Sequence, residues 1–324
     1  MKLYTFKIIF FIAISISPLY SNDYVIAFGS CLDQDADQDI FRSIEKDEID
    51  SFIFLGDNIY PVEDKNIISN LKKAYKKQSE KIPSWIYSKN IYAIWDDHDY
   101  GDNDGGESFQ FKQTSQEFFL EFWKIPKYDE RWQRDGIYFQ DNIKISGLTI
   151  NIIGLDTRFF RSDLKGSKFF YRTSDDDTSS ILGNDQWNWL ANELEKEADL
   201  TIILSSIQVL AENHRFEKWS LFPKEKTKLI NMLTQKKDQI IVLSGDRHKA
   251  GIYQKDNIFE ITSSSLNKPI PLSKYSFETD PLLLGSTYNK ENYGLIEINS
   301  LTREVNLSIK DINGQKQIEK KISL

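Results

Sequence analysis

The polar side chains best suited to chemistry come directly after short apolar runs of the sequence. Four such runs lead into Gly29-Ser30-Cys31, Gly56-Asp57-Asn58-Ile59-Tyr60, Trp95-Asp96-Asp97-His98-Asp99 and Ser244-Gly245-Asp246-Arg247-His248. Ligands in layered α/β folds bind just beyond the carboxyl ends of the strands. One such residue alone would suit a helix cap or a turn, but four of these segments in one chain indicate a shared site.

The residue types at these positions predict a metal site. Asp57, Asp97 and Asp246 would form a dense negative centre, which can be buried only if cations neutralise it. Tyr60 follows Asp57 by three residues and can turn its phenol toward the same ion. Two softer donors complete the set, Cys31 and His248. Thiolate, phenolate and imidazole suit a transition metal such as ferric iron, whereas carboxylates with amides and water suit calcium, magnesium or manganese. The alternative for the single Cys is a buried apolar role.

These residues meet only if the runs that precede them are neighbouring strands. Apolar periodicity predicts strands at Tyr24–Gly29, Ser51–Leu55, Ile91–Trp95, Thr149–Leu155, Leu200–Ser205, Gln239–Leu243, Asn257–Thr262, Tyr293–Ile298 and Arg303–Ile309. It predicts helices at Asp37–Lys46, Ile67–Gln78, Ser115–Trp123, Asp185–Lys196 and Lys224–Thr234. Alternation followed by strands from about residue 251 predicts an α/β layered sandwich in a single domain, residues 22–324.

Composition limits the kind of metal and the kind of partner. The chain has 324 residues, 41 Lys and Arg against 49 Asp and Glu, three His and one Cys, with a formal charge of -8. An acidic balance argues against duplex nucleic acid, which requires a basic face. One Cys excludes an intrachain disulfide and the paired-Cys zinc modules, and three His exclude a His-rich centre. A bound metal must therefore rely mainly on oxygen ligands.

Residues 1–21 are typical of a secretory signal peptide. Lys2 and Lys7 flank the start of an apolar run, Ile8–Ile16, and Pro18–Ser21 offers a cleavage segment. The run is too short to span a bilayer, and no later stretch approaches the length required. We therefore expect an exported protein, periplasmic or secreted, without a membrane span. A buried first strand or helix is the alternative.

The ordered motifs, together with Leu155-Asp156-Thr157-Arg158, resemble those of the alkaline phosphatase D family of calcineurin-like metallophosphoesterases. The resemblance runs from about residue 24 to about residue 266. It implies a four-layer αββα sandwich, with two mixed β-sheets packed face to face and helices outside. It also implies a small phosphate-ester substrate.

The resemblance further implies two metal sites. An iron-type site would use Cys31, Asp57, Tyr60 and His248. A second site for Ca²⁺, or for Mg²⁺ or Mn²⁺, would use Asp57, Asp97 and Asp246. Gln208 stands where the wider superfamily places another His ligand, and its carbonyl would substitute. The usual Asp-x-His of the first superfamily motif is absent, and Cys31 takes its place, as is consistent with this family.

The expected reaction is direct hydrolysis, in which a hydroxide held between two metals attacks phosphorus in line. His98 is the predicted general acid, and Asp99 beside it would set its tautomer. Arg158 and Asn103 are predicted to bind phosphate oxygens. The alternative for Arg158 is a structural salt bridge, and the alternative partner for Asn103 is the second metal. His214 lies in a polar loop and is expected to be exposed. Two other functions remain open: a strict phosphodiesterase or phospholipase-type activity, and a non-catalytic periplasmic metal-binding protein.

Overall fold

Two six-stranded mixed sheets form the centre of the molecule in a computed structural model that describes residues 23–167, 170–271 and 279–324. The predicted signal peptide lies outside the described residues. The first sheet has the order β14-β13-β12-β1-β2-β3, and the second has the order β10-β11-β9-β8-β5-β4. The expectation of a layered sandwich with two mixed sheets is confirmed.

The first sheet joins both ends of the described chain. Its strands are β1 (Asp23–Gly29), β2 (Ser51–Leu55), β3 (Asn90–Ile94), β12 (Asn292–Asn299), β13 (Glu304–Asp311) and β14 (Lys316–Ser323). β1, β2 and β3 run parallel, and the other three pair antiparallel. Because β1, β2 and β3 are parallel, their carboxyl ends meet at one edge of the sheet.

The second sheet follows the same plan. Its strands are β4 (Phe139–Ile145), β5 (Leu148–Gly154), β8 (Leu200–Ser205), β9 (Gln239–Ser244), β10 (Ala250–Lys255) and β11 (Ile258–Ser263). β5, β8, β9 and β11 run parallel, and β4 and β10 are antiparallel edge strands. A separate hairpin consists of β6 (Lys165–Ser167) and β7 (Phe170–Arg172).

Side-chain alternation in the second sheet separates two hydrophobic cores. In β8, Ile202 and Leu204 face the core shared with the first sheet, whereas Ile203 faces an outer core. In β9, Leu243 faces the shared core and Val242 the outer one. Both faces of these strands are therefore buried, as expected for parallel strands covered on both sides.

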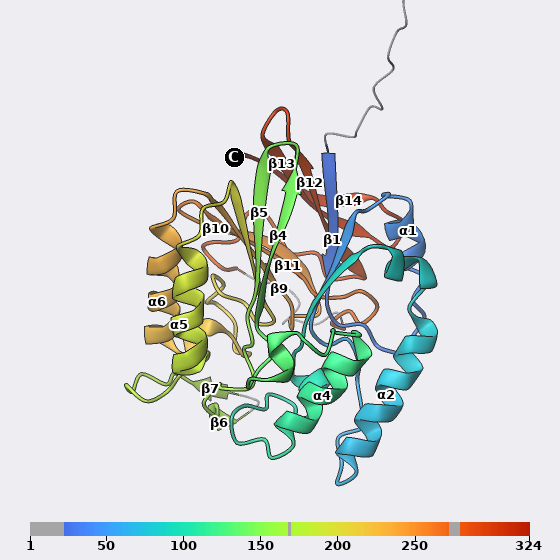
Figure 1. Cartoon of the computed structure of the whole chain (residues 1–324), viewed down its shortest axis with the longest axis vertical. Helices are drawn as coiled ribbons and strands as arrows, with labels where there is room; N and C mark the ends of the chain where they lie inside the picture. The colour runs from blue at the N-terminus through green and yellow to red at the C-terminus, as the bar shows by residue number, and fades with distance from the viewer. Residues whose placement is uncertain (1–22, 168–169, 272–278) are drawn as a thin grey trace, which may run out of the picture.

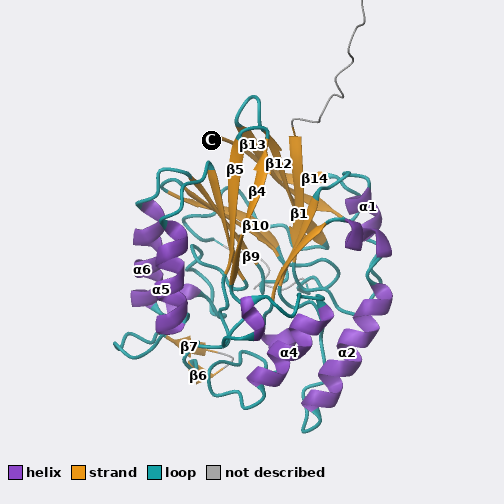
Figure 2. Cartoon of the chain, in the orientation of Figure 1, coloured by secondary structure: helices purple, strands orange, loops and turns teal. Residues whose placement is uncertain are grey.

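Helices cover the outer faces, as Figures 1 and 2 show. The helices are α1 (Phe41–Glu45), α2 (Ile67–Lys81), α3 (Asp97–Tyr100), α4 (Lys112–Phe122), α5 (Gly183–Leu194) and α6 (Pro223–Thr234), with 3₁₀ turns at Ser84–Ser88, Glu130–Trp132 and Trp219–Leu221. α5 and α6 lie on the outer core of the second sheet, and α1 and α2 lie on the opposite side of the molecule. In the described part of the chain, no helix is long and apolar enough to span a membrane.

Several elements differ from the sequence-based expectation, among them α3, β10 and the β6–β7 hairpin, which were not predicted. The helix predicted at Asp37–Lys46 is only α1, because the carbonyl of Asp37 accepts a hydrogen bond from the amide of Asn267 and belongs to a loop. β14 was not predicted, because it is an edge strand rich in lysine whose side chains are mostly exposed. Edge strands of this composition resist pairing with other chains.

Candidate metal centre

The predicted ligands lie at the strand ends where the two sheets come together. Cys31 follows β1, Asp57 follows β2, and Asp97 begins α3 directly after β3. Asp246 and His248 follow β9 of the other sheet. A Cβ on Gly245 would lie 2.6 Å from the hydroxyl of Ser30, so only glycine permits the loops of the two sheets to approach this closely.

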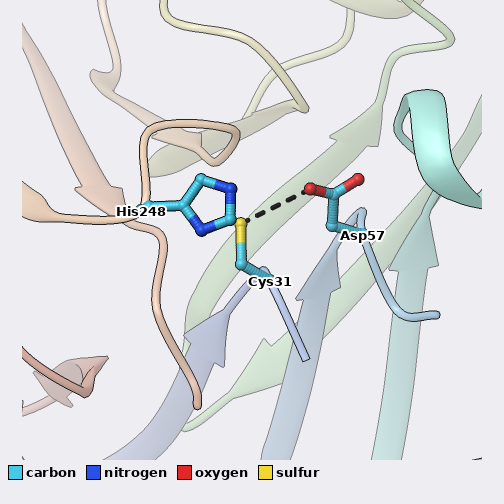
Figure 3. Close-up of side chains that lie close together, drawn as sticks. All are labelled: Cys31, Asp57 and His248. Carbon is cyan, nitrogen blue, oxygen red and sulfur yellow. Dashed lines mark hydrogen bonds between the residues drawn. The ribbon is translucent and has the colours of Figure 1, made fainter. Parts of the chain in front are cut away.

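Three groups of donor atoms form at this edge, each with its ligand atoms within 4.8 Å of one another. The groups are Cys31 with Asp57 and His248, Asp57 with Asp97 and His98, and Asp96 with Asp97 and Asp246. Figure 3 shows the first group, in which a thiol, a carboxylate and an imidazole from three separate loops face a common space. The Cys31 thiol donates to Asp57 over 3.5 Å. Asp57 belongs to the first two of these groups and Asp97 to the last two, so the three groups are continuous.

Four residues of this cluster have a left-handed backbone conformation, which is also found at turns elsewhere in the chain. Cys31, Asp57, Asp246 and His248 all have positive φ, between 52° and 64°. This conformation costs a non-glycine residue roughly 1–2 kcal/mol. Strain of this kind persists where the surrounding structure enforces it and is common at functional sites.

Tyr60 completes the group. Its hydroxyl donates to Asp57 Oδ2 over 2.8 Å, which places the phenolic oxygen beside the Cys31 and His248 donors. The imidazole Nδ1 of His248 lies 2.5 Å from the backbone carbonyl of Lys268, which leaves Nε2 as the nitrogen available to a metal. Metal-binding His residues commonly use their second nitrogen in this way.

The electrostatics of the cluster fit bound cations. Burial and the charge of Asp97 raise the pKa of Asp57 to about 7. Burial and the charges of Asp96 and Asp97 raise the pKa of Asp246 well above its ordinary value. Burial, followed by the charge of Asp57, does the same to the pKa of the Cys31 thiol. The buried Oδ1 of Asp57 has no hydrogen-bond partner among the described residues. These groups can ionise together only if positive charge enters the cluster.

His98 lies over this cluster but has a different partner from the one expected. Its ring is 4.3 Å from the Tyr60 ring, and its Nδ1 lies 3.0 Å from a carboxylate oxygen of Glu63. Asp99 instead accepts the backbone N–H groups of Asn58 and Asp96, and thereby holds the start of α3. The carboxylate beside the His98 imidazole is therefore that of Glu63, where Asp99 was predicted.

Arg158 forms the structural salt bridges that were the alternative to a contact with phosphate. Its guanidinium is fully buried and lies between the carboxylates of Asp96 and Glu217, the latter at 2.6 Å. Glu217 also pairs with Arg161 at 2.9 Å. This buried set, which we call the ion quartet (Asp96, Arg158, Arg161 and Glu217), has balanced charges. Arg158 is therefore committed to Asp96 and the chain around it, in place of the predicted contact with phosphate.

Gln208 and Asn103 are likewise engaged within the protein. The Gln208 carbonyl accepts from Arg247 Nε over 3.1 Å, and its amide donates to Thr262. The Asn103 amide donates to Asp104 over 2.8 Å. Neither contact involves a metal ligand, so the binding roles of both residues stay predictions.

His214 is less accessible than its polar sequence suggested. Both of its ring nitrogens are buried and have no hydrogen-bond partner among the described residues. Burial and the nearby charge of Arg247 hold its pKa well below the ordinary value. The side chain of His214 is therefore not exposed, contrary to the prediction.

A family model described as PhoD-like phosphatase matches residues 71–276, which is more than half of the chain. The chain belongs to the PhoD-like phosphatase family. Membership supports phosphoesterase activity and a metal-dependent site. The match includes Asp97, His98, Asp246 and His248, whereas the predicted ligands of the first two loops, Cys31, Asp57 and Tyr60, precede it.

Solved structures give the same fold for this PhoD-like chain. PhoD itself has a TM-score of 0.70 at 14% identity, with 93% of this chain and 68% of PhoD covered. GAP50, described as the anchor in the inner membrane complex of Plasmodium, has a TM-score of 0.62 at 13% identity, with 93% and 89% covered. Sequence comparison with curated proteins found no match. At these identities the likeness shows the fold of the PhoD-like chain.

Several functional contacts of this PhoD-like site were not visible in the sequence. Ser264 accepts the backbone N–H groups of Arg247 and His248 over 2.7 and 2.9 Å and lies 3.2 Å from the Cys31 sulfur. Glu63 and Glu217 lie outside every motif, so no local pattern marked them. Asp96 was part of a motif, but its pairing with Arg158 joins residues far apart in the chain.

Proposed function

We propose that this chain is an exported, metal-dependent phosphoric ester hydrolase acting on small phosphate esters, with residues 22–324 as one catalytic domain. The observation that carries the proposal is the meeting of Cys31, Asp57 and His248 within 4.8 Å, on strained backbone, in a member of the PhoD-like phosphatase family. Export is supported by the residue pattern of positions 1–21.

The chemistry of the donors supports two unlike ions. Cys31, Tyr60 and His248 offer sulfur, phenolate oxygen and nitrogen, a set that suits Fe³⁺. Asp97 and Asp246 offer carboxylate oxygen, which suits Ca²⁺, Mg²⁺ or Mn²⁺. Metal ions in such a site supply Lewis-acid neutralisation of phosphoryl charge and activation of the attacking water.

The residues of the chain itself provide proton transfer and order. Glu63 lies at Nδ1 of His98, where it orients the ring and favours the protonated imidazole. Nε2 of His98 is then the atom that gives its proton to the leaving oxygen. Asp104 donates its backbone N–H to Asp97 over 2.8 Å and so fixes the orientation of that carboxylate.

A non-catalytic metal-binding role is the second candidate. It is favoured by the shared fold of GAP50, a protein described as an anchor. Phosphodiesterase or phospholipase-type action is a variant of the leading proposal, because family membership does not choose between one and two ester groups on phosphorus.

The test combines elemental analysis with two substrates. The metal-loaded protein is assayed with p-nitrophenyl phosphate and with its bis ester, and metal content is measured on the same sample. Hydrolysis of either ester, lost on chelation, is the expected result. A fully loaded protein that hydrolyses neither ester would favour the non-catalytic role.

His98→Ala then tests the mechanism. We expect turnover to fall by roughly 10²–10⁴-fold, with metal content unchanged. Glu63→Gln should cause a smaller fall, because the ring nitrogen keeps a polar neighbour. Unchanged turnover in the His98 variant would contradict the assignment of the general acid.

A further inference from the structure

Charge balance leaves the metal centre without excess positive charge for its substrate, because the charge of protonated His98 is paired with Glu63. With Cys31 and Tyr60 bound as thiolate and phenolate, these two and the three aspartates Asp57, Asp97 and Asp246 carry five negative charges. One trivalent and one divalent ion would neutralise that charge and leave no excess. Phosphate esters are anionic, so a further positive group beside the centre would strengthen their binding.

Buried arginines near the centre do not provide that group. Arg158 and Arg161 are fully buried in the ion quartet, where each pairs with a carboxylate. Arg247 is 3% exposed, and its Nε donates to Gln208. A substrate arriving from solvent meets none of these guanidinium groups first.

Lys268 has the accessibility that the arginines lack. Its ammonium lies 4.0 Å from the centroid of the Tyr60 ring, while that ring lies 4.3 Å from the ring of His98. The Tyr60 hydroxyl in turn donates to the central ligand Asp57. The side chain of Lys268 is 38% exposed. The ammonium is therefore partly exposed to solvent beside Tyr60, a predicted ligand that also contacts the predicted general acid.

The backbone around Lys268 holds this position. Its carbonyl lies 2.5 Å from Nδ1 of His248, and the preceding Asn267 exchanges hydrogen bonds with the backbone of Asp33. The carboxylate of Asp33 accepts from the Lys268 ammonium over 2.5 Å. An ammonium has three N–H donors, so this bond leaves others for an anion.

We propose that Lys268 binds a negatively charged oxygen of the substrate, and that this contact makes the site favour doubly charged phosphomonoesters over singly charged phosphodiesters. The inference rests on the proposed phosphoesterase function and adds a substrate class to it. The ion pair with Asp33 holds the ammonium beside Tyr60 before substrate arrives.

Two substitutions with opposite effects test the proposal in the full-length, metal-loaded protein. Lys268→Met removes the cation and keeps the length of the side chain. Asp33→Asn removes the negative charge that faces the Lys268 ammonium. The variant keeps a side-chain oxygen that can accept the N–H of Asp35, as Asp33 does over 2.8 Å. Lys76→Met, at an exposed position on α2, is the matched control.

For Lys268→Met, kcat/KM for p-nitrophenyl phosphate should fall about 10–100-fold, as for loss of one charged hydrogen bond. The value for the bis ester should change far less. Asp33→Asn should keep or raise the monoester value, since the ammonium is then less neutralised. Lys76→Met should match the wild type, and all four proteins should carry the same metal content.

Binding of inorganic phosphate, measured by calorimetry on the metal-loaded proteins, gives a readout that needs no turnover. Lys268→Met should weaken it about tenfold or more. Three results would each overturn the proposal. They are an equal loss of kcat/KM on both esters, a loss in Asp33→Asn that parallels the loss in Lys268→Met, and an unchanged affinity for inorganic phosphate. A wild-type protein that hydrolyses neither ester would count against the proposed function alone, because the phosphate titration still decides whether Lys268 binds the anion.

Discussion

The ion quartet predicts a large and non-additive loss of stability when one of its charges is removed. Glu217 accepts from Arg158 over 2.6 Å and pairs with Arg161 at 2.9 Å, and all of these side chains are at most 1% exposed. Glu217→Gln keeps the shape of the side chain but leaves two buried guanidinium groups with Asp96 as their one remaining acid in the quartet. No solvent reaches the excess positive charge that results.

The magnitude follows from this burial. Removing one partner of a buried ion pair costs roughly 3–5 kcal/mol, because the other charge stays buried and uncompensated. Arg158→Met should cost a similar amount, since it leaves the buried carboxylate of Asp96 without its ion-pair partner. The double variant retains one acid and one base. Its loss should therefore be smaller than the sum of the two single losses, with a coupling of roughly 0.5–3 kcal/mol.

Urea unfolding of the metal-free proteins, followed by tryptophan fluorescence, measures these differences without a contribution from metal binding. Lys224→Met is the control, because Lys224 forms an exposed pair with Asp177, and its unfolding free energy should equal that of the wild type within error. A loss below about 1 kcal/mol for Glu217→Gln, or strictly additive losses in the double variant, would refute the reasoning.

Two further predictions concern the metal-free centre. Against the effect of burial, the charges of Asp97 and Asp57 raise the pKa of His98 to about 10, above its unfolded value near 6.5. The protonated imidazole therefore stabilises the folded state fully at a pH below its unfolded pKa, and this stabilisation is lost as the pH rises toward its folded pKa. Thermal melts with chelator should therefore show a falling Tm from about pH 7 to about pH 9, and metal should remove this dependence; a constant or rising Tm of the chelated protein would contradict it. Asp246→Gly should abolish binding at the second metal site yet raise metal-free stability by about 1–2 kcal/mol, because it relieves a left-handed backbone and removes a carboxyl group whose ionisation burial opposes. Urea unfolding tests this, and a less stable variant would count against it.

The strand framework was predictable because its signal is local. Buried runs such as Ser51–Leu55 and Leu200–Ser205 are strands with the predicted bounds. The two sheets also brought the motif residues after these runs together, because parallel strands share one edge for their carboxyl ends. The motifs did not indicate which residue each polar group would bind through a hydrogen bond or an ion pair.

Those partners depend on contacts between distant segments. Arg158 followed a strand and looked like an anion clamp, but Asp96 lies 62 residues away in the chain and holds its guanidinium. Asp99 is adjacent to His98 in sequence, yet on the first turn of α3 its carboxylate points back to the N–H groups before the helix. Glu63 reaches His98 only because of the loop that follows Asp57. Pairings of this kind come from tertiary packing, which leaves no periodic pattern in the sequence.

The backbone of the ligands adds an argument that does not depend on family membership. At Cys31, Asp57, Asp246 and His248 glycine would remove roughly 1–2 kcal/mol of strain per residue, and the chain carries glycine beside two of them, at Gly56 and Gly245. Three of these four residues carry a carboxylate or thiol whose pKa burial raises. A fold selected for stability alone would place glycine or a neutral side chain at each position. The combined cost is offset only when these side chains bind something that needs their negative charge, and cations are the ligands that meet that requirement.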